Sequence, residues 1–271
     1  MTSLDNIAPE RPRLYHAPSS YYSMIARLAL QEGGRAYEPI FVDIHFRMAQ
    51  QEPDYVRLNP NMTVPTLALP DRILPQSRDI ADYALGVVDD ELDAETRSWT
   101  DLHYGFPIDE FTFGGLLARN PLARILVPKK LAAAHRRLLE RAAAYPDLSA
   151  IYLARASVFA ERLRTFDPAG VVRLAEQRRE EAIGLMDRLE RHLAGAGAVM
   201  IPPNYGLADV VWTTFLARME FAGLGGELAA RPALARYWQA MQMRPSFAAA
   251  DLWTHMHPLR LIAGILGFAG R

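Results

Sequence analysis

The chain has 271 residues, about the length of two domains at the usual ~150 residues each. Half of the residues are hydrophobic and 23% are charged, a balance that excludes an intrinsically disordered chain. The formal net charge of -1 does not indicate a nucleic-acid-binding protein. Cysteine is absent, which excludes disulfides, thiolate metal sites and a cysteine nucleophile.

Residues 1–88 are predicted to form a small α/β domain with the order β-α-β-α-β-β-α. Strands are expected from short apolar or alternating runs, at 13–16, 37–44, 64–69 and 72–74. Helical patterns lie between or after these strands, from Met24 to the stop signal Gly33-Gly34, at 46–58, and from Ser77 to Gly86.

Residues 89–271 are predicted to form an all-helical domain, joined to the first by a linker at 87–92. Apolar residues three and four apart indicate its main helices, at 131–144, 151–166, 172–193 and 207–222. No run reaches the ~18 apolar residues of a membrane span, and the start does not resemble a signal peptide, so a cytoplasmic location is expected. The apolar tail 259–269 is expected to pack on the body or a partner chain, or alternatively to contact a membrane surface.

Three motifs stand at the ends of predicted elements. Val64-Pro65 enters a strand, whose interior normally excludes proline because proline lacks an N–H. Gln76-Ser77 begins a helix, where spare N–H groups favour a carboxylate ligand, although Ser77 could simply cap the helix. Further on, Asp209 stands at the third position of a helix whose cap is Gly206 instead of the usual Ser or Thr. These motifs, together with the predicted order of helices and strands, resemble those of the glutathione transferases.

The resemblance implies a thioredoxin-like α/β N-terminal domain followed by an all-α domain, with glutathione as co-substrate. It implies a cis peptide before Pro65 that leaves the backbone of Val64 free for the ligand, and a γ-glutamyl group held by Gln76 and Ser77. Asp209 would be a folding residue. Met62-Thr63 departs from the Lys or Gln often found before Val-Pro, so recognition of the glycyl carboxylate stays open.

Within the family, the resemblance is greatest to the bacterial tetrachlorohydroquinone reductive dehalogenases, notably at 52–59 and at 145–152. Alignment from Leu14 places Ser20 at the thiol-activating serine of the serine-type classes. It places Tyr22 where the dehalogenases, and the zeta-class transferases that the chain also resembles, have their cysteine. The resemblance therefore implies Ser20 as the hydroxyl donor to the glutathione thiolate, with Tyr21 or Tyr22 as alternatives. The remaining alternatives are Ser19, Ser23 or no side-chain donor at all.

The missing cysteine excludes thiol exchange on the enzyme, so direct attack of glutathione on a small aromatic electrophile is expected. Cleavage of lignin-derived β-aryl ethers to a thioether is the most specific hypothesis. The alternatives are substitution or addition on an activated aromatic ring, and an isomerisation of the maleylacetoacetate type. Several aromatic residues are expected to bind the substrate or, alternatively, to pack in the core. They are Tyr104, Phe106, Phe111, Phe113 and Trp253.

Other possibilities concern partners and metals. The chain is expected to form a homodimer or a heterodimer with a related chain, and the alternative to an enzyme is a non-catalytic subunit or binding protein of such a heterodimer. His255 and His257 have no acidic residue nearby at ligand spacing, so no metal site is expected.

Overall fold

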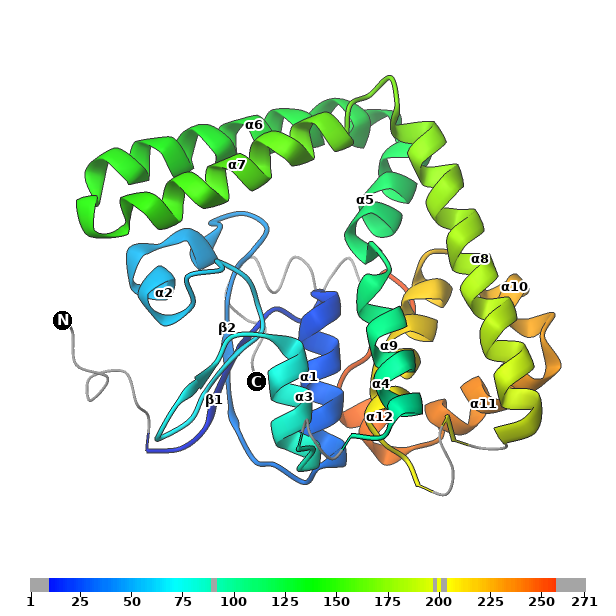
Figure 1. Ribbon diagram of the computed structural model, residues 1–271. Coiled ribbons are helices and arrows are strands. Elements are labelled where there is room, and N and C mark those ends of the chain that lie inside the picture. Colours follow the sequence, from blue (N-terminus) through cyan, green and yellow to red (C-terminus); the bar gives the residue numbers. More distant parts are fainter. Residues whose placement is uncertain (1–9, 89–91, 197–198, 201–203, 257–271) are drawn as a thin grey trace. The chain divides into compact units, whose positions relative to one another are not determined.

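The computed structural model describes residues 10–88, 92–196, 199–200 and 204–256 (Figure 1). His257 and the predicted tail segment 259–269 lie outside these residues. Contacts divide the chain into two compact units, the first made of 1–50, 63–105 and 186–271, the second of 51–62 and 106–185. These units are not continuous in the sequence, and the predicted domains 1–88 and 89–271 remain a prediction.

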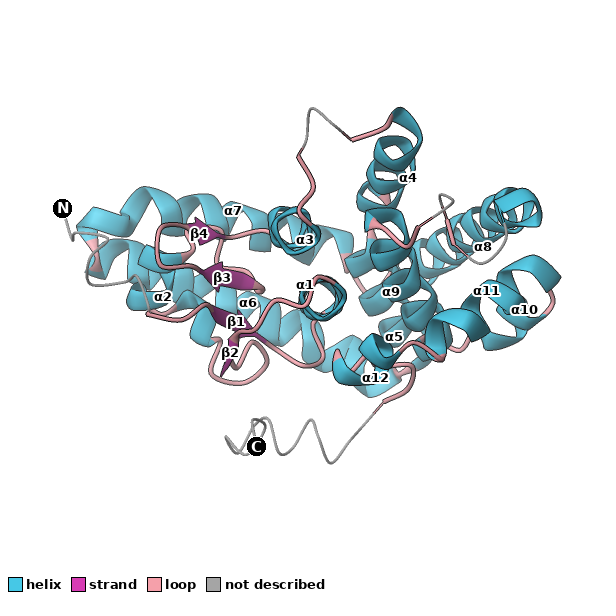
Figure 2. Cartoon of the chain, turned by 90° about the horizontal axis from the view of Figure 1, so that it is seen from below, coloured by secondary structure: helices cyan, strands magenta, loops and turns pink. Residues whose placement is uncertain are grey.

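The first unit contains a four-stranded sheet in the order β2-β1-β3-β4. β1 (Arg13–His16) pairs in parallel with β2 (Glu38–Phe41) and antiparallel with β3 (Thr66–Ala68), which pairs antiparallel with β4 (Ile73–Leu74). Helices α1 (Tyr21–Glu32) and α3 (Ser77–Leu85) cover one face of this sheet (Figure 2). With α2 (Pro53–Leu58) the predicted order of elements is confirmed.

The predicted stop signals end both sheet-covering helices. Gly33 lies so close to α3 that a Cβ atom there would be 1.9 Å from the carbonyl oxygen of Ala84, so only glycine fits. Gly86 ends α3 in the left-handed conformation, with φ of 68°, which glycine adopts without steric cost.

The helix predicted at 46–58 is shorter than expected. A 3₁₀ turn occupies Ala49–Gln51, and α2 begins only at Pro53. Proline has no backbone N–H and its ring clashes with the preceding turn, so Pro53 is compatible with a first helical position but not with a helix interior.

Helices that precede and helices that follow residues 106–185 in the sequence complete the first unit. They are α4 (Ala94–Gly105), α9 (Leu207–Phe221), α10 (Gly225–Ala229), α11 (Pro232–Gln242) and α12 (Pro245–Ala249). α9 packs against α1 and α4 and is buried without interruption from Leu207 to Met219. The indole N–H of Trp212 on α9 donates to the carbonyl of Trp99 on α4 at 3.2 Å.

Asp209 fixes the start of α9 as the capping motif predicted. One carboxylate oxygen accepts from the backbone N–H of Gly206 at 3.0 Å. The other accepts from the backbone N–H of Met200 at 2.7 Å and the hydroxyl of Tyr237 at 3.0 Å. The side chain is only 1% exposed, and burial raises its pKa despite these three hydrogen bonds. Asp209 is therefore a structural residue.

The second unit is built on a long helical hairpin. α6 (Pro121–Ala144) begins ten residues before the predicted start, and α7 (Ser149–Thr165) returns beside it (Figure 1). Helix α5 (Ile108–Arg119) precedes the hairpin, and α8 (Val171–Ala196) begins in this unit and ends in the first. No helix of the described residues is long and apolar enough to cross a membrane.

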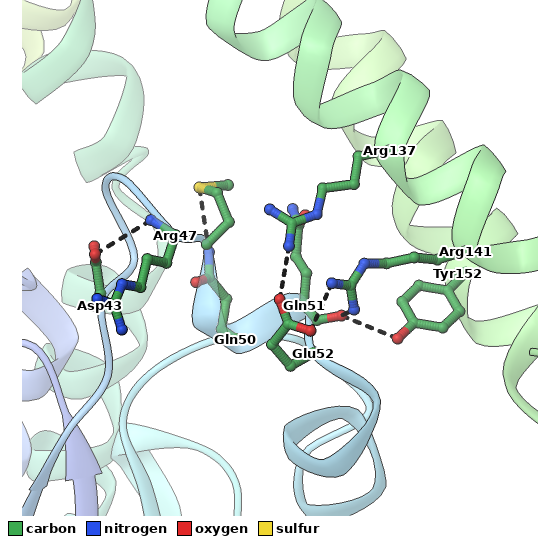
Figure 3. A network of polar contacts seen from close by, with 9 residues as sticks. Asp43, Arg47, Gln50, Gln51, Glu52, Arg137, Arg141 and Tyr152 are labelled. Carbon is green, nitrogen blue, oxygen red and sulfur yellow. Dashed lines mark hydrogen bonds and ion pairs between the residues drawn. The ribbon is translucent and has the colours of Figure 1, made fainter. Parts of the chain in front are cut away.

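Charged side chains attach the segment before α2 to this hairpin (Figure 3). The Glu52 carboxylate accepts from Arg137 and Arg141 of α6, each at 2.6 Å. The carbonyl of Gln51 accepts from Arg141 at 2.5 Å and from the hydroxyl of Tyr152 on α7 at 2.9 Å.

Replacing Asp209 with alanine should lower the free energy of unfolding by about 3 kcal/mol, because two buried donors and one partly buried donor lose their acceptor. Chemical denaturation followed by circular dichroism measures this change. Asp54→Ala is the matched control, since the Asp54 side chain is fully exposed and its pair with Arg57 is long at 3.5 Å. Equal stability of the two variants would contradict a structural role for Asp209.

Candidate active site

Two of the predicted motifs meet at one pocket in the first unit. The cavity has a volume of about 460 Å³ and is lined by Tyr22, Thr63, Val64, Pro65, Pro75, Gln76, Ser77, Arg78, Asp79 and Tyr104. The peptide between Val64 and Pro65 is cis. Gln76 is the cap residue of α3 and makes no side-chain capping hydrogen bond, and Ser77 is the first residue of the helix. The pocket therefore contains the amino end of α3, which favours a negatively charged group.

An aromatic pair forms another part of the pocket lining. The rings of Tyr22 on α1 and Tyr104 on α4 are nearly parallel, with centroids 6.4 Å apart. The hydroxyl of Tyr104 is 3.3 Å from Oγ of Ser77, a long hydrogen bond in which either oxygen can donate. Ser77 is only 4% exposed, and burial raises the pKa of Tyr104, so its phenol is neutral. Tyr104 thus brings α4 into contact with the amino end of α3.

Two charged residues that the sequence did not single out also line the pocket. Arg78 forms an ion pair with Asp101 at 2.8 Å and lies over the Tyr104 ring at 5.9 Å. Asp79, in the first turn of α3, has its pKa raised by burial, against the opposing effect of Arg78. They could have been suspected because they follow Gln76-Ser77 directly.

The three hydroxyls predicted for thiol activation have different surroundings. Tyr22 lines the pocket, whereas Tyr21 is buried and its hydroxyl lies 2.6 Å from Nε2 of His103. Ser20 caps α1: its Oγ accepts from the backbone N–H of Ser23 at 3.4 Å, and it is not among the residues lining the cavity. Oγ of Ser19 is 2.8 Å from Nε2 of His45.

His103 is a buried residue whose role the sequence did not reveal. It is 3% exposed, and burial lowers its pKa to about 3, so the imidazole is neutral. Its Nδ1 has no hydrogen-bond partner among the described residues. The ring packs edge-on against Tyr104 and Trp212. His103 therefore joins α4 to α1 through Tyr21, and its position next to Tyr104 in the aromatic cluster was the available signal.

The other predicted substrate residues are not part of this pocket. Phe106 and Phe111 are buried and contact each other, with ring centroids 5.8 Å apart, and Phe113 contacts Phe166 at 6.2 Å. All three belong to the second unit. Trp253 is 3% exposed, and its backbone N–H contacts the sulfur of Met24. Their surroundings fit the core-packing alternative, and a contact with substrate remains a prediction for each of them.

No group of three or more His, Asp or Glu side chains that could hold a metal ion occurs in the described part of the chain.

Comparisons with known proteins identify the family of the chain. A family model for the glutathione S-transferase N-terminal domain matches residues 14–87. Tetrachloro-p-hydroquinone reductive dehalogenase from Sphingobium chlorophenolicum is 33% identical over 245 residues, covering 88% of this chain and 94% of the relative. The chain belongs to the glutathione transferase superfamily. The predicted thioredoxin-like domain followed by a helical domain is thereby confirmed.

Solved structures of this superfamily share the fold. A glutathione transferase family member from Pseudomonas fluorescens pf-5, with two glutathione bound, has a TM-score of 0.63 at 19% identity, over 90% of this chain and 93% of its own. The β-etherase LigF from Sphingobium sp. strain SYK-6 has a TM-score of 0.61 at 17% identity, over 88% and 98%. Membership of the superfamily implies glutathione as co-substrate, while the residues that bind it remain a prediction.

Two histidines of this chain, His16 and His103, should make its stability depend on pH. Burial and nearby Arg27 lower the pKa of His16 to about 4, beside the value of about 3 for His103. An unfolded histidine titrates near ~6.5, so below that pH only the unfolded chain takes up these protons. The free energy of unfolding should therefore fall from pH 6.5 towards pH 4, by up to ~1.4 kcal/mol per pH unit for each histidine.

Urea denaturation of the wild type and of His103→Gln across this pH range isolates the contribution of His103. The raised pKa of Asp209 acts in the opposite sense, but it is present in both proteins and cancels in the comparison. The variant should show a shallower pH dependence, and the double variant His16→Gln/His103→Gln a shallower one still. Parallel curves for all three proteins would show that His103 is not held neutral by the fold.

Proposed function

We propose that this protein transfers the glutathionyl group, through its sulfur, to an electron-poor, halogen-bearing aromatic ring. The 33% identity with a reductive dehalogenase supports this class of substrate. The observation that carries the proposal is the pocket in which Tyr22 lies with Val64, Pro65, Gln76 and Ser77. These are the residues that the family resemblance implies for glutathione binding, with a phenol where the alignment places the dehalogenase cysteine.

Glutathione would bind with its γ-glutamyl carboxylate at the amino end of α3. Ser77 offers a hydroxyl there, and the first backbone N–H groups of the helix offer further donors. Gln76 can hold the α-amino group through its side-chain oxygen. The backbone of Val64 would pair with the peptide part of the ligand, as the family resemblance implies.

Tyr22 is proposed as the hydroxyl that stabilises the thiolate. A free thiol has a pKa near ~8.5, so a hydrogen-bond donor at the sulfur increases the thiolate fraction at neutral pH. Tyr21 is less suited because its hydroxyl is engaged by His103. Ser20 remains the alternative donor, since its hydroxyl hydrogen is not used when its oxygen accepts from Ser23.

The proposed reaction is a nucleophilic substitution at an aromatic carbon. The thiolate sulfur forms a bond to the ring carbon that carries the halogen, and the carbon–halogen bond then breaks to release halide. The product is an aryl thioether of glutathione. Because the chain has no cysteine, it cannot remove the aryl group by thiol exchange. Net reductive dehalogenation would need a second thiol from solution.

β-Aryl ether cleavage, the most specific hypothesis from the sequence, has weaker support. The β-etherase resembles this chain at 17% identity, a level that shows the fold alone. A chlorinated hydroquinone or another activated aryl halide is therefore the first substrate to test, and a β-aryl ether the second.

Kinetics of two variants separate thiol activation from glutathione binding. Tyr22→Phe should lower kcat about 10²-fold, which is the usual effect of removing one hydrogen-bond donor to an anion in an enzyme active site. The same change should raise the pKa of the thiol of bound glutathione. Ser77→Ala should raise KM for glutathione about tenfold with little change in kcat. Tyr145→Phe on the surface serves as the control.

Each alternative has a distinct outcome. Full activity in Tyr22→Phe with loss of activity in Ser20→Ala would assign the donor role to Ser20. Glutathione binding by calorimetry without turnover of any aryl halide or aryl ether would indicate a non-catalytic binding subunit. Absence of glutathione binding would overturn the proposal.

A further inference from the structure

The first half of α6 exposes a row of large apolar side chains. Leu122, Ile125 and Leu126 are 63%, 56% and 52% exposed. They are three and four residues apart, so they lie on one side of the helix. The opposite side of α6 packs into the core of the second unit through Ala123, Val127 and Leu131. Contiguous exposed apolar side chains are typical of interaction surfaces.

Positive charges continue the exposed side of α6 towards its carboxyl end. Lys129 and Lys130 are exposed and follow Leu126 by three and four residues, so they lie one turn further along the same side. They are the only lysines of the chain. No aspartate or glutamate occurs between Glu110 and Glu140, whereas this segment contains four arginines besides the two lysines. The charged residues that accompany the apolar row are therefore all basic.

Exposed leucines beside lysines fit the surface of a bilayer that contains anionic phospholipid. Apolar side chains can enter the boundary between headgroups and acyl chains, while lysine ammonium groups stay among the phosphates at the ends of their long apolar stems. A second copy of the chain fits less well, since a symmetrical contact through this face would bring Lys129 and Lys130 close to their own counterparts. A nucleic acid would use the charges but not the leucines.

We propose that α6 docks this protein on membrane surfaces rich in anionic phospholipid. The docking face consists of Leu122, Ile125, Leu126, Lys129 and Lys130. A face with three apolar residues supports a weak, reversible contact whose electrostatic part is weakened by salt. The proposal goes beyond the transferase activity proposed above and does not depend on it, because all of these residues belong to the second unit.

Co-sedimentation with phospholipid vesicles tests the requirement for anionic lipid. The wild type should bind vesicles made of equal parts of phosphatidylglycerol and phosphatidylcholine about tenfold more tightly than vesicles of phosphatidylcholine alone. Leu122→Ser/Leu126→Ser and Lys129→Ser/Lys130→Ser should each weaken binding to the mixed vesicles about tenfold, because one variant loses the apolar contact and the other the charges.

Two double variants in the first unit are the matched controls. Val88→Ser/Met243→Ser removes two exposed apolar side chains, and Arg191→Ser/Arg236→Ser removes two exposed positive charges, as the lysine variant does. Both controls should bind the mixed vesicles like the wild type. Circular dichroism of every variant checks that the fold is kept.

Acetylation of lysine provides a second measurement, because Lys129 and Lys130 are the only lysines of the chain. The mixed vesicles should protect both side chains from acetic anhydride, as followed by mass spectrometry, and vesicles of phosphatidylcholine should not. Wild-type protein that fails to sediment with the mixed vesicles, or that sediments equally well as both α6 variants, would overturn the proposal.

Two further outcomes would assign the face to a different partner and so also overturn the proposal. One is a smaller oligomer of Leu122→Ser/Leu126→Ser by light scattering, with no vesicle binding by the wild type, which indicates a second copy of the chain. The other is retention of the wild type on immobilised polyglutamate but not on the mixed vesicles, which indicates an acidic protein.

Discussion

The geometry of the candidate active site depends on two consecutive residues at the carboxyl end of α4. His103 lies 2.6 Å from the hydroxyl of Tyr21 on α1, and Tyr104 reaches Ser77 at the start of α3. The first contact is buried and the second is partly buried, so a displacement of α4 would break polar contacts that lie largely away from water. This pair of side chains therefore keeps the amino ends of α1 and α3 in register around the pocket.

The rest of the first unit supports α4 in that position. α9 is buried along almost its whole length, and Trp212 connects it to α4 through the carbonyl of Trp99. The start of α9 is held in turn by Asp209, which binds two backbone N–H groups and the hydroxyl of Tyr237. Because a buried polar network is stable only when its donors and acceptors are paired, the loss of one member affects the helices it joins.

The chemistry of the proposed reaction follows from the absence of cysteine and from the presence of a tyrosine at position 22. Without cysteine the chain has no thiol of its own, so glutathione is the source of the reacting sulfur. A phenol at position 22 can donate a hydrogen bond to a thiolate but cannot attack a thioether sulfur. The expected product is therefore a thioether and a halide, which distinguishes this protein from a relative that bears the name reductive dehalogenase.

Sequence alone determined the order of elements, the fold family and the identity of the capping residues, because each depends on short-range signals. Glycine at helix ends, proline at a strand entrance and an aspartate three residues into α9 act within a few residues of themselves. The helix predicted at 46–58 is too long because the segment is polar and helix-compatible throughout, whereas Pro53 fits only the first helical position, where α2 begins.

Only the tertiary structure decided which side chains meet. The aromatic residues of 104–113 looked alike in the sequence, yet Tyr104 lines the pocket while Phe106 and Phe111 pack against each other in the other unit. The pairing of Tyr21 with His103, 82 residues apart, has no sequence signal. Such contacts depend on how distant helices pack, a property that no local spacing encodes.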